Sequence, residues 1–473
     1  MNKTFIYKKL FPALTLLCVA VIYRLTLAPD VLMGDGGRFQ ILAGVGGIAH
    51  PPGYALYTLT VYAFTRVCFA DPAFCANLFS AVAALASLAV LYVLLRRLNI
   101  HYIIRIIALL TLAFSALFWL LSIRAEVYTF YLFFVAAALY LSLIAFDRFS
   151  VAAASAALFF WGVAVSGRPL FLPVVVVFIL ILWHQRRYFQ KRYLFLLGGI
   201  LFLLPMVLKI FYLGFVDFYS FGYNYIEQYN AEFAILPEAD NLNHLLQRMS
   251  WLVSGSQFQS RIYVDVANMK TAVTELARLF FKANLTIVAL PPAAAGGWRL
   301  YKRKPRFFIL LALTIGCNLL YFFMTHAGDR ITFLLPTLLV LTIAFAAGME
   351  GVREWKYKAV AAFALLPLFL LLHNYANTDR SNLTLYRDFV VDFGRQAPTH
   401  ASLFCPWPVS TALIYAQLIE NCHSDVRIIP IHKSEIETYM NRYDFQAPFY
   451  KLEVDDKLNS SFLRLKSAGG NNR

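Results

Sequence analysis

The sequence has 473 residues, of which 60% are hydrophobic, 16% aromatic and 14% charged, and its net charge is +16. Soluble domains carry about 25% charged residues, so this composition excludes an ordinary soluble protein and predicts a polytopic membrane protein with apolar runs of about 20 residues. The excess of basic residues is typical of loops held at an anionic cytoplasmic leaflet, an explanation that we favour over nucleic-acid binding.

The first predicted span is 10–28, which follows Lys3, Lys8 and Lys9 and lacks a clear cleavage site, so we expect an uncleaved helix with a cytoplasmic N-terminus. The first outer loop is then 29–73. Within it, 54–69 is apolar but short and contains several Tyr and Thr residues. We interpret this segment as a helix on the membrane surface rather than a span. This choice decides on which side every later segment lies.

Ten further spans are predicted at 74–95, 103–121, 127–146, 150–166, 169–183, 193–214, 282–297, 306–324, 331–348 and 357–373. With this assignment the strongly basic loops 184–192, 298–306 and 350–358 all lie on the cytoplasmic side, as the positive-inside rule requires. The sequence therefore predicts an all-α bundle of about eleven transmembrane helices with its C-terminus outside.

The chain divides into an expected transmembrane domain, 1–373, and a C-terminal region outside the membrane, 374–473. The long outer loop 215–281 is rich in aromatic residues and is expected to contain interfacial helices that cover a site. In the C-terminal region, SLFCP and DVRIIPIH are typical of short strands and TALIYAQLIE of a helix, which gives a small α/β-like unit.

The six cysteines show no CxxC spacing. Cys405 and Cys422 would be able to pair if the C-terminal region lies in an oxidising compartment. Cys18, Cys68, Cys75 and Cys317 are interpreted as packing residues of apolar segments. No HExxH motif or other ligand set for a metal is apparent.

With this topology, several ionisable residues gather on the outer side, and such residues at membrane segments are functional hypotheses by default. They suit glycosyl transfer from a lipid phosphate, which needs a base for the acceptor and cations for the leaving phosphate. Asp35 is the first candidate base and Glu126 the second. The candidate substrate-binding residues are Arg38, His50, Arg168, His326 and Arg330.

Each of these residues also has a purely structural explanation. Asp35 would serve as the N-cap of a helix that begins near Gly37, and Glu126 would pair with Arg124. Arg168 and Arg330 would anchor helices at the membrane interface. The convergence of these residues on one face, rather than any single one of them, favours a functional site.

The motifs GDGGRFQILAGVGGIAHPPGYALY, AEVYTFYLF and NYANTDRSNLTLYRDF…ASLFCPWPVSTALIYAQLIENCHSDVRII resemble the GT-C glycosyltransferases, in particular a former family of unknown function that includes a protein O-mannosyltransferase. The resemblance implies that Asp35 is the catalytic acidic residue of the first loop, that His50 lies near the donor and that Glu126 belongs to the EVY element. Two features depart from it: LFCPWPVS lacks the acids found in related chains, and GDGG provides one acid instead of two.

The resemblance implies an inverting glycosyltransferase that takes a sugar, with mannose as the first candidate, from a polyprenyl-phosphate donor. The acceptor would be a protein, a lipid or a glycan, and neither cofactor nor metal is expected. The protein would be an integral multi-pass protein surrounded by membrane lipids, and in a bacterium its site would face the periplasm from the inner membrane. Two alternatives stay open: a transporter or flippase for lipid-linked sugars, and a non-catalytic scaffold of envelope assembly.

Overall fold

The computed structural model describes residues 10–185, 192–278, 284–355, 357–430, 449–454 and 460–465. Each of the eleven predicted spans coincides with a helix or with consecutive helices. These are α2 (Phe11–Thr26), α5 (Pro72–Arg97), α6 and α7 (Tyr102–Ala113, Ala116–Ser122), α8 (Tyr128–Arg148), α9 (Val151–Gly167), η2 and α10 (Pro169–Phe171, Leu172–His184), α12 (Arg192–Tyr219), α16 (Thr286–Arg303), α17 (Pro305–Met324), η5 and α18 (Arg330–Leu334, Leu335–Trp355), and α19 and α20 (Tyr357–Phe363, Leu365–Thr378).

Among the described helices, six are long and apolar enough to cross a membrane, and a seventh is obtained if α6 and α7, which are bent by 68° at their junction, form one span. Others are shorter: α2 has 16 residues and α9 has 17. At about 1.5 Å per residue these fall short of a hydrocarbon core of about 30 Å. The chain is thus mostly helical, and the count of eleven spans stays a prediction.

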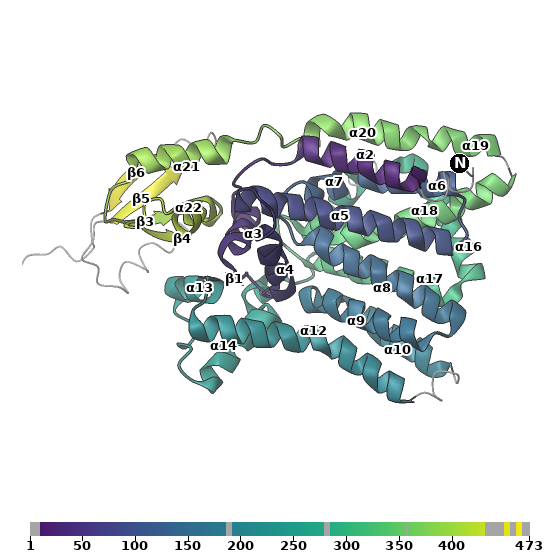
Figure 1. The fold of residues 1–473 in the computed structure, drawn as a ribbon, viewed down its shortest axis with the longest axis horizontal. Coiled ribbons are helices and arrows are strands. Elements are labelled where there is room, and N and C mark those ends of the chain that lie inside the picture. The colour runs from purple at the N-terminus through teal and green to yellow at the C-terminus, as the bar shows by residue number, and fades with distance from the viewer. Residues whose placement is uncertain are drawn as a thin grey trace, which may run out of the picture.

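The first outer loop forms two helices, α3 (Gly34–Val45) and α4 (Ala55–Thr65). The 11 residues of α4 extend over only about 16 Å, which agrees with the prediction that 54–69 does not span. Both helices lie at the end of the bundle nearest the C-terminal sheet (Figure 1). Tyr57 and Val61 of α4 are fully buried, so this helix is packed into the protein.

Basic residues from two helix ends meet at one end of the bundle. Figure 1 shows the end of α10, the beginning of α12 and α19 at the right-hand end, opposite the C-terminal sheet. Asp147, at the end of α8, pairs there with Arg97 and with Lys304. The basic ends of these helices are therefore gathered at one end, and α3 and α4 lie at the other.

The outer loop 215–281 folds into β2 (Tyr223–Asn224), α13 (Tyr225–Phe233), α14 (Leu242–Ser254), η3 (Ser256–Arg261) and α15 (Val266–Arg278). Strand β2 pairs in parallel with β1 (Gly47–Ile48) of the first loop. Gly47 has φ +120°, and a Cβ there would lie 2.0 Å from the carbonyl oxygen of Tyr223, so only glycine permits this approach. The buried pair Arg248–Asp217, at 2.7 Å, joins α14 to α12.

The C-terminal region contains α21 (Leu385–Gln396), α22 (Trp407–Glu420) and a four-stranded sheet in the order β4-β3-β5-β6. Strands β3 (Ser402–Cys405) and β4 (Arg427–Pro430) are parallel and are connected by α22, while β5 (Phe449–Val454) and β6 (Ser460–Leu465) are antiparallel. The predicted order of strand, helix and strand is thus present.

Helix α22 packs directly on α3, because α3 carries glycines where the two helices meet. A Cβ on Gly37 would lie 2.7 Å from Thr411 Oγ1, and one on Gly44 would lie 2.4 Å from the Ile419 side chain. The Tyr415 hydroxyl donates to Asp71 at 2.7 Å. These contacts fix the C-terminal region to the first outer loop.

The cysteines differ from the prediction. Cys68 and Cys75 form a disulfide, with their Cα atoms 6.1 Å apart, so their assignment as packing residues is wrong. The physical reason is the tight connection after α4, which returns the chain at once to the first turn of α5. Cys405 and Cys422 are free thiols, and Cys405 is buried in β3, so the pairing considered for them is absent.

The close packing of Gly37 against both Leu32 and Thr411 of α22 predicts that Gly37→Ala is destabilising. The new Cβ would lie 2.3 Å from the Leu32 carbonyl oxygen, and such overpacking costs about 1–3 kcal/mol. We expect a clear fall in the melting temperature of the detergent-solubilised protein. Gly199→Ala in α12 is the matched control, since no atom lies within 4 Å of its Cβ position. An equal response of the two variants would contradict tight packing at Gly37.

Candidate functional site

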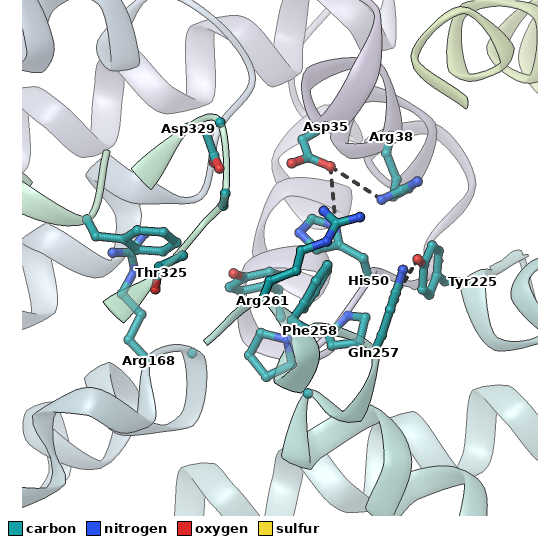
Figure 2. A pocket seen from close by; sticks show the side chains of 18 of the residues that line it. Asp35, Arg38, His50, Arg168, Tyr225, Gln257, Phe258, Arg261, Thr325 and Asp329 are labelled. Carbon is teal, nitrogen blue, oxygen red and sulfur yellow. Dashed lines mark hydrogen bonds and ion pairs between the residues drawn. The ribbon is translucent and has the colours of Figure 1, made fainter. Parts of the chain in front are cut away.

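A cavity of about 930 Å³ opens where the first outer loop, the loop 215–281 and α22 meet the ends of the bundle helices. Its lining includes five of the predicted site residues: Asp35, Arg38, His50, Glu126 and Arg168. Figure 2 shows Asp35 and Arg38 on one side of this cavity and Arg168 on the other. The structure thus brings together side chains that are up to 133 residues apart in the sequence.

Asp35 lies in the first turn of α3, where the helix dipole favours a negative charge. It is not the N-cap, because the helix begins at Gly34 and Met33 occupies the capping position. The Asp35 Oδ1 atom is 3.3 Å from Arg38 Nη1 and 3.6 Å from His50 Nδ1. The capping explanation is therefore wrong, and the carboxylate borders the cavity.

His50 begins the HPPG turn, in which the Gly53 N–H donates to the His50 carbonyl oxygen at 2.9 Å. Burial lowers the pKa of His50 below its ordinary value, although the nearby Asp35 carboxylate raises it. The imidazole is therefore neutral at neutral pH, and its contact with Asp35 is polar rather than an ion pair. Gly53 has φ +95°, a conformation that glycine adopts readily.

Glu126 lies between α7 and α8 with only 7% of its surface exposed. Its backbone N–H donates to Ser80 Oγ at 3.1 Å, which fixes this segment on α5. Burial raises the pKa of the Glu126 carboxyl to about 7, despite the lowering effect of Arg124, whose Nη2 lies 3.3 Å from Oε1. A carboxyl with a pKa near neutrality is suited to proton transfer.

Arg168 follows the last residue of α9 and is 5% exposed. Its guanidinium lies over the rings of Tyr128 and Phe333, with its carbon 4.4 Å and 5.2 Å from the ring centres. Both terminal nitrogens are buried, and neither has a hydrogen-bond partner among the described residues. Burying a cation without hydrogen-bond partners costs free energy unless an anion binds beside it.

His326 and Arg330 are neighbours in sequence of residues that line the cavity, but they do not line it themselves. The His326 ring stacks on Tyr263, with ring centres 3.8 Å apart. Arg330 is buried and pairs with Glu275 at 2.8 Å. Between them in the same segment, Asp329 does line the cavity and accepts a hydrogen bond from the Tyr128 hydroxyl at 2.9 Å.

Several lining residues were not predicted individually. Tyr225, Gln257 and Phe258 come from the loop 215–281, as expected for a region that covers a site, and the Tyr225 hydroxyl donates to Gln257 at 2.8 Å. Trp407 comes from α22. Their only sequence signal was the aromatic content of these segments. Among the described residues, no group of three His, Cys, Asp or Glu side chains is arranged to hold a metal ion.

Comparison with known proteins gives matches in sequence and in structure. Residues 35–192, about a third of the chain, match the family model of the protein O-mannosyl-transferase TMEM260 N-terminal domain. The TMEM260 proteins of Dictyostelium discoideum and Mus musculus are 30% identical over 125 residues and 37% identical over 117 residues. These matches cover 26% and 24% of this chain, but only 15% and 16% of those relatives.

The crystal structure of ArnT from Cupriavidus metallidurans bound to undecaprenyl phosphate superposes with a TM-score of 0.59, at 13% sequence identity, over 95% of this chain and 94% of ArnT. At that identity the similarity establishes the fold. The chain thus has the fold of ArnT, and its long apolar helices are those of an integral membrane protein. The resemblance to the TMEM260 O-mannosyltransferases is confirmed over residues 35–192.

The raised pKa of Glu126 predicts a pH-dependent stability. Because the folded protein binds this proton more tightly than the unfolded chain, stability is lost as pH rises from about 4.5 to about 7. The loss is complete above pH 7 and amounts to a few kcal/mol at most. In Glu126→Gln we expect the melting temperature to fall less than in the wild type between pH 4.5 and pH 8. Parallel pH profiles for the two proteins would contradict a raised pKa.

Proposed function

We propose that this protein is an inverting glycosyltransferase that moves a sugar from a polyprenyl phosphate to an acceptor hydroxyl at the non-cytoplasmic face of the membrane. Mannose is the first candidate sugar, because the relatives are named protein O-mannosyl-transferases. The acceptor is a protein, a lipid or a glycan. The observation that carries the proposal is the buried guanidinium of Arg168, whose terminal nitrogens have no hydrogen-bond partner among the described residues, in a cavity that Asp35 and Glu126 also line.

The surroundings of Arg168 suit a lipid phosphate. The planar guanidinium matches two phosphate oxygens, and both of its terminal nitrogens are available among the described residues. Pro169 and Leu170, which follow it, also line the cavity and provide an apolar border. The structurally similar ArnT was crystallised with undecaprenyl phosphate, which supports a donor of this chemical type.

The proposed reaction is a single displacement. The acceptor hydroxyl oxygen attacks the anomeric carbon, its proton passes to a carboxylate, and the bond from that carbon to the phosphate oxygen breaks with inversion. The bonding electrons leave on the phosphate, whose charge Arg168 holds. Asp35 is the proposed base, with Arg38 and His50 as its neighbours. Glu126, buried against Arg124, is the second carboxyl available for proton transfer.

The side of the membrane is proposed from two features. The Cys68–Cys75 disulfide immediately follows the first outer loop helices, and disulfides persist in oxidising compartments such as the bacterial periplasm. The basic ends of α5 and α17 meet at the opposite end of the bundle, as expected for the cytoplasmic side. In a bacterium the site then faces the periplasm from the inner membrane.

Arg168→Met should weaken the binding of polyprenyl phosphate on the order of 10- to 100-fold, since charge-assisted hydrogen bonds contribute about 1.5–3 kcal/mol. Binding is measured by titrating purified protein in nanodiscs with the lipid. Arg66→Met is the matched control, because Arg66 also lies 4.4 Å from a tyrosine ring, that of Tyr62, but does not line the cavity. Equal binding by Arg168→Met and the wild type would contradict the proposal that Arg168 binds the donor phosphate.

Asp35→Asn should abolish sugar transfer while polyprenyl phosphate still binds, because only the proton acceptor is lost. The assay follows label from polyprenyl-phosphate mannose into acceptor-containing membrane extract, with wild type and variant compared at equal folded concentration. Equal transfer by both would make Asp35 structural and Glu126 the base. Binding without any transfer by the wild type, combined with movement of the labelled lipid between leaflets, would favour a flippase.

A further inference from the structure

Trp407 is the one residue of α22 that lines the cavity, and it belongs to the LFCPWPVS segment, where the acids of related chains are missing. We propose that Trp407 is a positioning residue that holds Arg38 against Asp35, so that the catalytic centre is complete only when the C-terminal region is docked. The inference rests on the proposed function, in which Asp35 accepts the proton.

The Arg38 guanidinium is bordered by two aromatic rings. Its carbon lies 4.6 Å from the ring centre of Tyr225 and 5.4 Å from that of Trp407, both within the range of cation–π attraction. One ring comes from the loop 215–281 and the other from the C-terminal region. Arg38 is 6% exposed, so little of its side chain is in contact with water.

This arrangement bears directly on Asp35. The Arg38 Nη1 atom is 3.3 Å from Asp35 Oδ1, and the Nε atom has no hydrogen-bond partner among the described residues. Arg38 is thus attached through one nitrogen to the carboxylate, is also in hydrogen-bond contact with the Tyr223 side chain, and has two aromatic rings beside its guanidinium. Removing the Trp407 ring would free one face of the guanidinium and allow it to turn away from Asp35.

The backbone of Trp407 is restricted, while its side chain is 37% exposed. It is the first residue of α22 and is flanked by Pro406 and Pro408, which restrict the backbone. Its ring lies 3.6 Å from the position of a Cβ on Gly34, the residue before Asp35. A larger residue than glycine at 34 would meet the ring, and Gly34 also has φ +67°.

Ion pairs also fix the C-terminal region to the segment that precedes α3. Arg387 of α21 pairs with Asp30 at 2.7 Å and with Glu420 of α22 at 2.7 Å. Asp30 lies in the first outer loop, five residues before Asp35. The ion pairs therefore join the same two segments that Trp407 and Gly34 join at the cavity.

The test compares Trp407→Ala, Trp407→Phe and Trp298→Ala. Trp298 is the matched control, since its ring lies 4.7 Å from the Lys302 ammonium but it does not line the cavity. In the transfer assay we expect Trp407→Ala to lower kcat on the order of 10- to 100-fold with the KM for the donor nearly unchanged. Trp407→Phe should recover most of the rate, and Trp298→Ala should match the wild type.

An unchanged kcat in Trp407→Ala would overturn the proposal, and so would a rise in the donor KM alone, which would make Trp407 a donor contact. A failure of Trp407→Phe to recover the rate would also count against positioning through a ring. Melting temperatures of Trp407→Ala, Arg38→Met and the double variant provide a readout without activity. We expect the melting temperature of the double variant to fall by less than the sum of the two single decreases. Strictly additive decreases would show that Trp407 and Arg38 are not coupled.

The two proposals fail in different ways. If the wild type binds polyprenyl phosphate but transfers no sugar, the proposed function fails, while the melting-temperature cycle still decides whether Trp407 and Arg38 are coupled. If the wild type transfers sugar and the cycle is additive, the proposed function stands and the positioning by Trp407 is excluded.

Discussion

The structure depends on a buried pair of side-chain amides, Gln40 and Asn77, both fully inaccessible to solvent. Gln40 Nε2 donates to Asn77 Oδ1 at 3.2 Å, and Asn77 Nδ2 donates to the Ala28 carbonyl oxygen at 2.9 Å. The Ala125 N–H donates to the same Asn77 Oδ1 at 2.8 Å. Burying an amide without hydrogen-bond partners costs free energy. This network therefore holds α3, α5 and the segment before Glu126 in fixed positions relative to one another.

The remaining walls of the cavity come from segments far away in the sequence. Strand β2 joins the loop 215–281 to the first loop through Gly47, and α22 closes on α3 over its glycines. The first loop is therefore in contact with two later regions, each of which adds an aromatic ring beside Arg38. Glycine residues have a common function here, since each allows a second segment to approach the first loop, at α3 or at β1.

The sequence was sufficient where the signal is local. Apolar runs predicted the helices, and the HPPG turn and Asp35 are found at the cavity as expected. It was insufficient where a contact is made across the fold. The Cys68–Cys75 disulfide depends on how tightly the chain turns between α4 and α5, and Trp407 reaches Arg38 only because α22 docks on α3. No local sequence pattern predicts either contact. The missing acids of LFCPWPVS argued against a role of this segment in the site.

Arg168 and Arg330 illustrate the same limit in electrostatic terms. Both were predicted as phosphate ligands from their positions near the ends of predicted spans. In the structure Arg168 directly follows α9, Arg330 begins η5, and each is 5% exposed. Arg330 Nε lies 2.8 Å from Glu275 Oε2. Because this carboxylate neutralises the guanidinium, the pair attracts a further anion only weakly. In the described part of the chain, Arg168 lies over the faces of Tyr128 and Phe333, and its two terminal nitrogens have no hydrogen-bond partner. The presence or absence of a carboxylate partner, which is a property of the fold, is therefore what separates a structural arginine from a candidate for binding the donor phosphate.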